Sequence, residues 1–392
     1  MVNVGECSMA KLPPARKGGE KTKVASPRPP SAPSLETRLE HLDQQLVRLL
    51  NERTELAVKI ARLRQASGEP GFSLGREEDA VSRAVESSKG PLPGRSVRAV
   101  FREAVSGARS LVRELRIAFL GPLYSYSHLA AIHRFGQTVE FMPVGSIPAV
   151  FEEINRGHSD FGIVPVENST DGRVTDTMDM FTRLPVRVCG EVELEIHHAL
   201  LARCSRAEIK EVYSRPQALS QCRNWLAKHL PLARTIEVTS TSTAAQLAHE
   251  KPGASAIASL QAGIHYGLNV LAEQIEDNPS NTTRFAIVGD HPNPRTGRDK
   301  TAMMFQVEHR PGGLADALNI FKRNRLNLTW IESFPIPESK GSYLFFVEME
   351  GHETDARLRR AIAALEQKTL RLEILGSFPA GQVISDRPDA SP

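Results

Sequence analysis

The first regular pattern in the chain is a helical recurrence of apolar residues. From Leu35 to Ile60 the leucines and isoleucines fall on one helical face, and no glycine or proline interrupts them. This pattern predicts one amphipathic helix of roughly 30 residues, too long to bury its apolar stripe against one short neighbour. Further helical segments are predicted at about 75–88 and 95–114. We therefore expect an all-α helical module at 34–114 that dimerises.

Strand-like and helical segments alternate over 115–290. Short apolar runs begin with RIAFLG at 116–121 and continue to TRFAIVG at 283–289. This alternation predicts an α/β domain built on a sheet. One long run, VCGEVELEIHHALLA at 188–202, is predicted to be a single strand.

The last regular module, 299–379, has a different order of elements. Strand, helix, strand, strand, helix and strand are predicted at 301–308, about 313–324, 327–334, 342–350, 354–368 and 370–376. This βαββαβ order is typical of a ferredoxin-like α+β domain. A polar, proline-rich stretch at 290–299 is predicted to be a linker, and 380–392 a tail.

Composition is that of an ordinary globular protein, with 40% hydrophobic and 24% charged residues. No apolar run predicts a membrane span, and no basic and then apolar start predicts a secretory signal. Residues 1–33 carry six Lys or Arg against two Asp or Glu, which accounts for the net charge of +3, and they are predicted to be a disordered tail. The remainder has no basic stripe with interleaved aromatic residues, so no nucleic-acid partner is expected.

Cysteines and histidines give no metal-binding pattern. The four cysteines are Cys7, Cys189, Cys204 and Cys222. None has CxxC or CxxH spacing, which argues against a zinc site or disulfides and fits a cytoplasmic protein. His197 and His198 would point to opposite faces of a strand, and we interpret them as packing or surface residues. No cofactor or metal is implied, because there is no P-loop and no GxGxxG after a strand.

Two arginines fall on the apolar face of the long predicted helix. Arg53 lies within the leucine stripe, and Arg64 follows three turns later on the same face. A charge on a buried face needs a partner, either a structural ion pair or a ligand with carboxylates, which arginine grips in a fork geometry. Arg76 and Glu77 open the next helix and could complete such a pocket.

The segment LDQQLVRLLNERTELAVKIARLR at 42–64 resembles the long first helix of the AroQ-class chorismate mutase domain. That resemblance implies an intertwined helical dimer, which converts chorismate to prephenate by a Claisen rearrangement through electrostatics and positioning. By resemblance Arg53 and Arg76 hold carboxylates of the substrate. Arg64 hydrogen-bonds the ether oxygen, and Glu77 binds the ring hydroxyl.

Three positions differ from the mutase pattern. Glu36 stands where the family has an arginine that reaches the partner's site, although Arg38 is nearby. Ser73 replaces an aspartate, and Val112 replaces the Gln or Glu beside the ether oxygen. Losing one hydrogen bond to a developing charge can cost on the order of 100-fold in rate. Two alternatives stay open: an active mutase, or a dimerisation module without activity.

Five clusters of hydroxyl and amide side chains follow one another through the α/β domain. They are GPLYSYSHLAA, VPVENSTDGRV, VYSRPQALSQC, STSTAA and NTTRF. One such cluster is usually a helix cap or a turn, but helix N-termini with hydroxyls also bind anions. Five clusters in one domain therefore predict a polar cleft for a small anionic molecule.

Together these motifs resemble prephenate dehydratase over 116–288, with ENSTDG and TTRF as the most specific pieces. The resemblance implies a two-lobed, periplasmic-binding-protein-like α/β domain that binds substrate between its lobes. A dehydratase of this family forms phenylpyruvate by removing CO2 and the C4 hydroxyl of prephenate, which needs a proton donor near C4.

By resemblance Thr283 is catalytic, and Arg284 orients it or holds a carboxylate. Implied substrate contacts are Asn168, Ser169, Gln217, Ser240, Thr241, Ser242 and Thr243. Tyr124 replaces a family glycine at the cleft, so prephenate and its amino analogue arogenate both stay open as substrates.

The segment PGGLADALNIFKRNRLNLTWIESFPI at 311–336 resembles an ACT domain, a regulatory fold that binds amino acids. Related dehydratases carry Gly-Ala-Leu and Glu-Ser-Arg-Pro motifs, which bind phenylalanine. By resemblance the effector contacts are Gly313, Leu314, Glu332 and Ser333. Gly313 replaces the alanine of the first motif, and Phe334 replaces the arginine of the second. A purely structural dimerisation domain is the alternative.

The chain as a whole resembles the bifunctional chorismate mutase/prephenate dehydratases of phenylalanine biosynthesis. The resemblance implies chorismate and prephenate as substrates, phenylalanine as effector, and a homodimer or higher homo-oligomer. One alternative is a monofunctional prephenate or arogenate dehydratase with an inactive helical module. Another is a non-catalytic metabolite sensor, which the TTRF motif disfavours because a binder has no need of a catalytic threonine.

Overall fold

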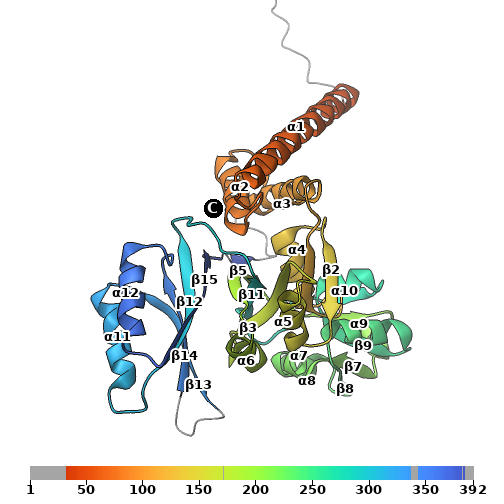
Figure 1. The fold of residues 1–392 in the computed structure, drawn as a ribbon. Helices are drawn as coiled ribbons and strands as arrows, with labels where there is room; N and C mark the ends of the chain where they lie inside the picture. The colour runs from red at the N-terminus through yellow and green to blue at the C-terminus, as the bar shows by residue number, and fades with distance from the viewer. Residues whose placement is uncertain (1–31, 171, 337–342, 382, 385–392) are drawn as a thin grey trace, which may run out of the picture. The chain divides into compact units, whose positions relative to one another are not determined.

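The computed structural model describes residues 32–170, 172–336, 343–381 and 383–384 (Figure 1). The chain divides into two compact units between Asn51 and Glu52, inside the first helix. Most of the predicted disordered tail, 1–33, lies outside the described residues. The described part contains a helical region, two α/β sheets and an antiparallel α+β sheet in that order, which confirms the predicted fold class.

Three helices make up the helical region: α1 (Ala32–Ala66), α2 (Leu74–Ser87) and α3 (Gly94–Ser110). Ser73 caps α2, because its hydroxyl accepts a hydrogen bond from the backbone N–H of Arg76 at 3.4 Å. The apolar stripe of α1 is not buried where the helix belongs to the larger unit: Leu56, Ile60 and Leu63 are 60%, 46% and 71% exposed. The long amphipathic helix is therefore confirmed, and its apolar face is available for a partner.

The first sheet has seven strands on the path β16-β5-β11-β3-β1-β2, with β4 paired to β3. Its strands are β1 (Arg116–Leu120), β2 (Glu140–Val144), β3 (Phe161–Asn168), β4 (Gly172–Arg173), β5 (Arg187–Glu195), β11 (Thr282–Gly289) and β16 (Val383–Ile384). Its helices are α4 (Tyr126–Phe135), α5 (Ile147–Asn155) and α6 (Thr175–Arg183). Strand β11 is antiparallel to both of its neighbours, β3 and β5. Strand β16 lies within the segment expected to be a tail and pairs with β5.

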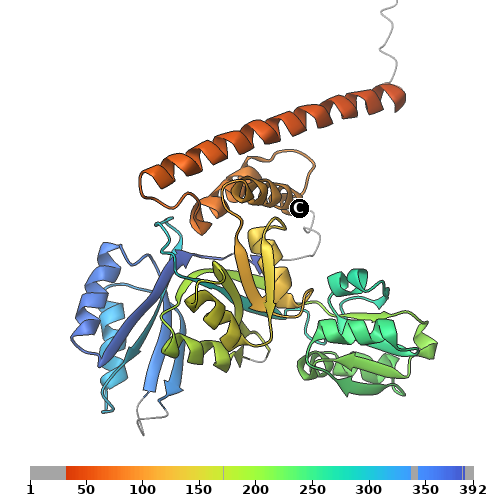
Figure 2. The same ribbon diagram turned by 45° about the vertical axis from the view of Figure 1, so that its right-hand side comes forward.

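The second sheet has the strand order β10-β6-β9-β7-β8 and forms a lobe of its own, drawn in green in Figure 2. Its strands are β6 (Ala199–Ala202), β7 (Glu211–Ser214), β8 (Arg234–Glu237), β9 (Ala254–Ala258) and β10 (Asn269–Ala272). Its helices are α7 (Pro216–Gln221), α8 (Arg223–His229), α9 (Thr241–Glu250) and α10 (Leu260–His265), with the short 3-10 turn η1 (Arg206–Glu208). Two α/β sheets joined by crossing chain segments are what the prediction of two lobes requires.

The prediction of a single strand at 188–202 is wrong, because the chain leaves the first sheet in the middle of this run. β5 ends at Glu195 and β6 begins at Ala199 in the other sheet. Between them the carboxylate of Glu276 accepts the backbone N–H of His198 at 2.9 Å and contacts His197 Nδ1 at 2.7 Å. A side chain thus satisfies the backbone where strand pairing stops, which allows the crossing.

Tyr124 occupies a left-handed backbone conformation, with φ of 64°. Glycine adopts this conformation at low cost, which fits the glycine that related dehydratases have at this place. The ring does not enter the cleft. It stacks on His265 of the second lobe, with ring centroids 3.9 Å apart. Tyr124 therefore connects the lobes and gives no reason to prefer arogenate to prephenate.

The third sheet has the order β13-β14-β12-β15 and confirms the predicted βαββαβ arrangement. Its elements are β12 (Asp299–Gln306), α11 (Gly313–Arg323), β13 (Leu328–Pro335), β14 (Tyr343–Glu350), α12 (Ala356–Glu366) and β15 (Arg371–Pro379). α11 and α12 share a core with one face of this sheet, through Phe321, Leu358 and Leu365. Phe334, Leu344 and Phe346 of its strands belong to the core of the first sheet. The third sheet is therefore packed on the α/β domain.

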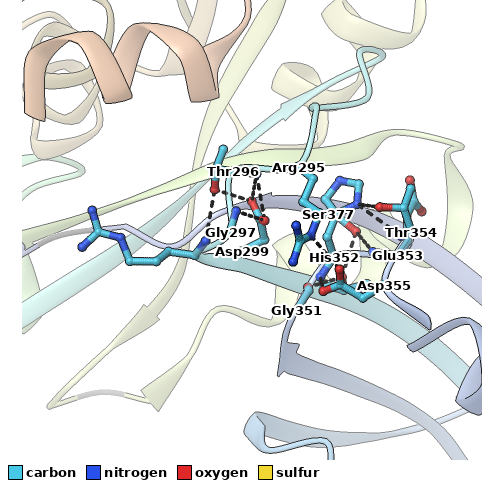
Figure 3. A network of polar contacts seen from close by, with 12 residues as sticks. Arg295, Thr296, Gly297, Asp299, Gly351, His352, Glu353, Thr354, Asp355 and Ser377 are labelled. Carbon is cyan, nitrogen blue, oxygen red and sulfur yellow. Dashed lines mark hydrogen bonds and ion pairs between the residues drawn. The ribbon is translucent and has the colours of Figure 1, made fainter. Parts of the chain in front are cut away.

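Polar contacts hold the predicted linker at 290–299, and Figure 3 shows those of Arg295, Thr296, Gly297 and Asp299. The carboxylate of Asp299 accepts the backbone N–H groups of Thr296 and Gly297, and Arg295 pairs with Asp355 at 2.6 Å. Asn293 donates from its side chain to the carbonyl of Cys189 in the first sheet at 2.7 Å. These contacts fix the path between the two domains.

No helix among the described residues is long and apolar enough to cross a membrane.

Candidate active site

A cavity of about 1050 Å³ lies between the first and second sheets. Most of its polar lining comes from the ends of strands and the starts of helices. The sequence-predicted residues that line it are Thr283, Asn168, Gln217, Ser240 and Thr241. The cavity therefore brings together side chains from four of the five clusters that the sequence singled out, and the first cluster joins them through Ser125, Tyr126 and Ser127.

Thr283 is positioned by the pairing of β11 with β3, in which it lies opposite Asn168. Asn168 Nδ2 donates a hydrogen bond to Thr283 Oγ1 at 2.8 Å. The amide orientation is fixed from its other side, because Asn168 Oδ1 accepts the backbone N–H of Thr170 at 3.0 Å. The threonine oxygen is thus an acceptor toward Asn168, which leaves its own proton for a group in the cavity. Accepting a hydrogen bond also strengthens a hydroxyl as a donor.

Helix N-termini give the cavity a positive electrostatic character. Residues at or next to the starts of α4, α5, α7 and α9 line it, represented by Ser125, Ser146, Gln217 and Ser240. Backbone N–H groups and helix dipoles at such ends favour anions. Two arginines, Arg173 and Arg215, and one acid, Asp176, complete the charged lining. A small molecule with carboxylates fits this arrangement.

Three other predicted contacts closely follow cavity-lining residues in the sequence. Ser169 Oγ accepts the backbone N–H of Thr282 at 2.9 Å and so braces the β3–β11 pair. Thr243 Oγ1 is 2.7 Å from Ser240 Oγ, which also caps α9 by accepting the Thr243 N–H at 2.9 Å. Ser242 is fully buried, and its hydroxyl has no partner among the described residues. None of these three lines the cavity.

His198 lines the cavity, although the sequence gave it only a packing role. Its Nε2 is 2.9 Å from Gln221 Oε1, and its Nδ1 is 3.3 Å from the hydroxyl of Tyr126. Burial lowers the pKa of His198, so the ring is neutral near pH 7. The pair of adjacent histidines gave no signal for this role, because the strand break that turns His198 toward the cavity was not predicted.

Arg284 is not brought to the cavity. It follows Thr283 on β11 and points to the opposite face, where its guanidinium lies over the ring of Trp330, 4.6 Å from the centroid. Arg284 Nη2 donates to Glu348 of β14 at 2.5 Å. This arginine therefore joins the first sheet to the third, and the structure gives it no contact with Thr283 or with the cavity lining.

A second cavity, of about 420 Å³, lies in the helical region. It brings together all four residues predicted for the mutase: Arg53, Arg64, Arg76 and Glu77. Burial lowers the pKa of Arg53, whose Nη1 also donates to the carbonyl of Ala104 at 3.4 Å. Arg76 pairs with Glu69 at 3.0 Å. Arg83 also lines the cavity and was missed in the sequence.

Glu77 is held from the side away from this cavity. Its carboxylate accepts from Arg109 at 2.8 Å, and both side chains are buried. Arg109 in turn donates to the carbonyl of Phe135 at the end of α4 at 2.7 Å. Arg134 of α4 donates to the carbonyl of Leu74 at 2.7 Å. Glu77 therefore lies at the contact between the helical region and the α/β domain as well as in the cavity.

The four predicted effector residues are not brought together within the chain. Gly313 and Leu314 open α11, where a Cβ on Gly313 would lie 2.7 Å from the carbonyl of Glu308. Glu332 and Ser333 are neighbours on β13, so their side chains point to opposite faces. Glu332 pairs with Arg173 of β4 at 2.8 Å. An effector that contacts both motifs would therefore also have to contact residues other than these four.

Three family models match the chain. They are chorismate mutase type II at 35–113, prephenate dehydratase at 117–293 and the ACT domain at 301–367. A bifunctional chorismate mutase/prephenate dehydratase of Aquifex aeolicus is 37% identical over 88% of this chain and 97% of its own length.

Two solved structures each match 68% of this chain. The prephenate dehydratase of Arthrobacter aurescens in complex with L-Phe has a TM-score of 0.64 at 33% identity, over 68% of this chain and 90% of that one. GqqA, described as a novel type of quorum quenching acylase, has a TM-score of 0.63 at 28% identity, over 68% and 98%. Because the same fold occurs in a prephenate dehydratase and in a protein described as an acylase, the function must be argued from the site.

Glu348 allows a test of the contact between the first and third sheets. Burial, together with the nearby carboxylate of Glu191, raises the pKa of Glu348 to about 7 against the opposing effects of Arg284 and Lys300. A raised pKa stabilises the fold below the unfolded value of about 4.5, and this stabilisation is lost as the pH rises through about 7. As the pH rises from 4.5 to 8, the free energy of unfolding of Glu348→Gln should therefore increase by roughly 1–3 kcal/mol relative to that of the parent. Denaturant unfolding at both pH values measures it.

Glu353→Gln is the matched control, because Glu353 pairs with Arg187 across the same two sheets but is partly exposed. An equal pH dependence in both variants would contradict the assignment to Glu348.

Proposed function

The chain belongs to the bifunctional chorismate mutase/prephenate dehydratase family, and on that premise we propose that the cavity between its first two sheets converts prephenate to phenylpyruvate. The observation that carries this proposal is the hydrogen bond from Asn168 to Thr283 inside a cavity bordered by helix N-termini. It combines a directed hydroxyl proton with an environment for carboxylates. Both are what a decarboxylative dehydration of a dicarboxylate requires.

The proposed mechanism assigns the reacting groups by charge. The carboxylates of prephenate bind toward the N-termini of α4 and α9, where Ser125 and Ser240 line the cavity. Thr283 donates a hydrogen bond to the C4 hydroxyl as its bond to carbon breaks. The electron pair of the broken bond to CO2 enters the ring and completes its aromaticity. The departing hydroxide takes up a proton from solvent, through its hydrogen bond with Thr283, and leaves as water. His198 is neutral and bonds to Tyr126 and Gln221, so its role is to shape the wall.

Replacing Thr283 tests the dehydratase directly. Thr283→Ala should lower kcat for prephenate by about 100-fold or more, since one general-acid group contributes roughly 10²- to 10⁴-fold. Thr283→Ser keeps the hydroxyl and should retain more activity than the alanine variant. Phenylpyruvate formation is measured by its absorbance, and circular dichroism checks the fold. Full turnover by a folded Thr283→Ala protein would remove Thr283 from catalysis.

We propose that the cavity of the helical region binds chorismate and catalyses its rearrangement. Arg53, Arg64, Arg76 and Arg83 surround one space, and the burial of Arg53 makes an anionic ligand favourable there. The exposed leucines of α1 support a second copy of the chain as the partner of this helix, because a single long helix cannot bury its own stripe. The protein is then at least a homodimer.

We place it in the cytoplasm, which fits its unpaired cysteines Cys189, Cys204 and Cys222.

Arg64→Met tests the mutase. It should lower kcat/KM for chorismate by about 100-fold, because it removes a donor to the charge that develops in the transition state. Conversion of added prephenate should stay within about twofold. Arg62→Met is the matched control, since Arg62 is exposed on the same helix and does not line the cavity. If the parent converts prephenate but not chorismate, the helical region serves dimerisation alone.

We propose that phenylalanine binds the third sheet and inhibits the dehydratase. The support is the ACT match and the dehydratase of Arthrobacter aurescens, whose structure is in complex with L-Phe. Phenylalanine at millimolar concentration should lower prephenate turnover severalfold, as expected for allosteric coupling of roughly 1–3 kcal/mol. Calorimetric titration gives the affinity. An absence of both binding and inhibition would leave the third sheet a structural domain.

A further inference from the structure

Arg173 lies at the junction of the substrate cavity and the third sheet. It belongs to β4, the short strand that pairs with the end of β3 beside Asn168, and it lines the cavity. Its guanidinium does not point only at the cavity. Nη1 donates to Glu332 Oε2 at 2.8 Å and to the carbonyl of Ser333 at 3.1 Å. The same guanidinium lies 4.9 Å from the centroid of the Phe334 ring. One arginine of the cavity wall is therefore held by three consecutive residues of β13.

The geometry of β13 concentrates such contacts on one face. Trp330, Glu332 and Phe334 alternate with more exposed residues, so their side chains share the face toward the first sheet. Trp330 contacts Arg284, which adjoins Thr283 on β11, while Glu332 and Phe334 contact Arg173. Strand β13 thus contacts both strands that flank Asn168, namely β11 and β4.

We infer that Arg173 is a positioning residue through which β13 of the third sheet sets the substrate affinity of the dehydratase cavity. With its guanidinium held by Glu332 and Phe334, the β4 segment is kept in place beside Asn168. Its backbone is tied to β3 as well, because the N–H of Val174 donates to the carbonyl of Val166 at 2.9 Å. Loss of the contact with Glu332 frees this wall of the cavity. This inference rests on the proposed dehydratase function and goes beyond it by assigning a role to the third sheet without any effector.

The experiment compares prephenate kinetics of Arg173→Gln, Glu332→Gln and the double variant in the absence of phenylalanine. Glu332 does not line the cavity, and its ion pair with Arg173 at 2.8 Å connects it to the cavity wall. We expect Glu332→Gln to raise KM about 5- to 10-fold with kcat within twofold. The double variant should be no worse than Arg173→Gln alone, because residues that act through one contact are not additive. An unchanged KM in Glu332→Gln overturns the inference.

Arg187→Gln is the matched control. Arg187 pairs with Glu353 across the same two domains at 3.2 Å, its side chain is 32% exposed against 36% for Arg173, and it does not line the cavity. Its KM should stay within twofold of the parent. An increase equal to that of Glu332→Gln would mean that any loosening of the domain contact weakens binding, which also overturns the specific role of Arg173.

Hydrogen exchange supplies a readout that does not need activity. The amide of Val174 should exchange about tenfold faster in Glu332→Gln than in the parent and should be unchanged in Arg187→Gln. Equal protection in all three proteins overturns the inference even if the chain turns over no prephenate. A parent without dehydratase activity whose Val174 amide still responds to Glu332→Gln would instead refute the proposed function and retain the coupling.

Discussion

The pairing of β11 with β3 is the constraint on which the rest of the site depends. β11 returns from the second lobe and lies antiparallel between β3 and β5. This register sets Thr283 opposite Asn168, and the alternation of side chains along a strand then sends Arg284 to the other face. One strand therefore presents a hydroxyl to the cavity between the first two sheets and a guanidinium to the third sheet. A register slip of one residue would exchange the two roles.

Buried ion pairs connect each neighbouring module to the α/β domain. At the third sheet Arg284 pairs with Glu348, and Lys300 pairs with Glu191 of β5. At the helical region Glu77 pairs with Arg109 and lies 3.8 Å from Arg134 of α4. Removing one member of a buried pair typically costs about 3–5 kcal/mol, because the remaining charge is left in a medium that solvates it poorly. Such contacts are specific more than they are strong. They favour one arrangement of the modules, in which β11 has charged neighbours on the side away from the cavity.

The positive electrostatic character of the two cavities has different sources. In the α/β domain the positive character comes mainly from helix N-termini and hydroxyls, which form hydrogen bonds without long flexible side chains. In the helical region it comes mainly from arginines of α1 and α2, and the N-terminus of α2 also borders that cavity. The first arrangement is complete within one chain, as Thr283 and Asn168 show. The second is open along the exposed stripe around Leu56 and Ile60, which is consistent with a site that a second copy completes.

Periodicity and turn chemistry predicted the modules, their order and the polar clusters, because both are local properties of a chain. Family resemblance also predicted two groups of site residues, and the structure brings each group to one cavity. Thr283, Asn168 and Gln217 line the first, and Arg53, Arg64 and Arg76 line the second. The sequence did not predict the break at His197 and His198, because a carboxylate almost 80 positions away, Glu276, satisfies that backbone. It could not show that Arg284 turns away from the substrate or that Arg173 faces Glu332, because the partners of a long charged side chain are chosen by packing between distant segments. Only the tertiary structure decides those contacts, since they depend on which surfaces the fold removes from water.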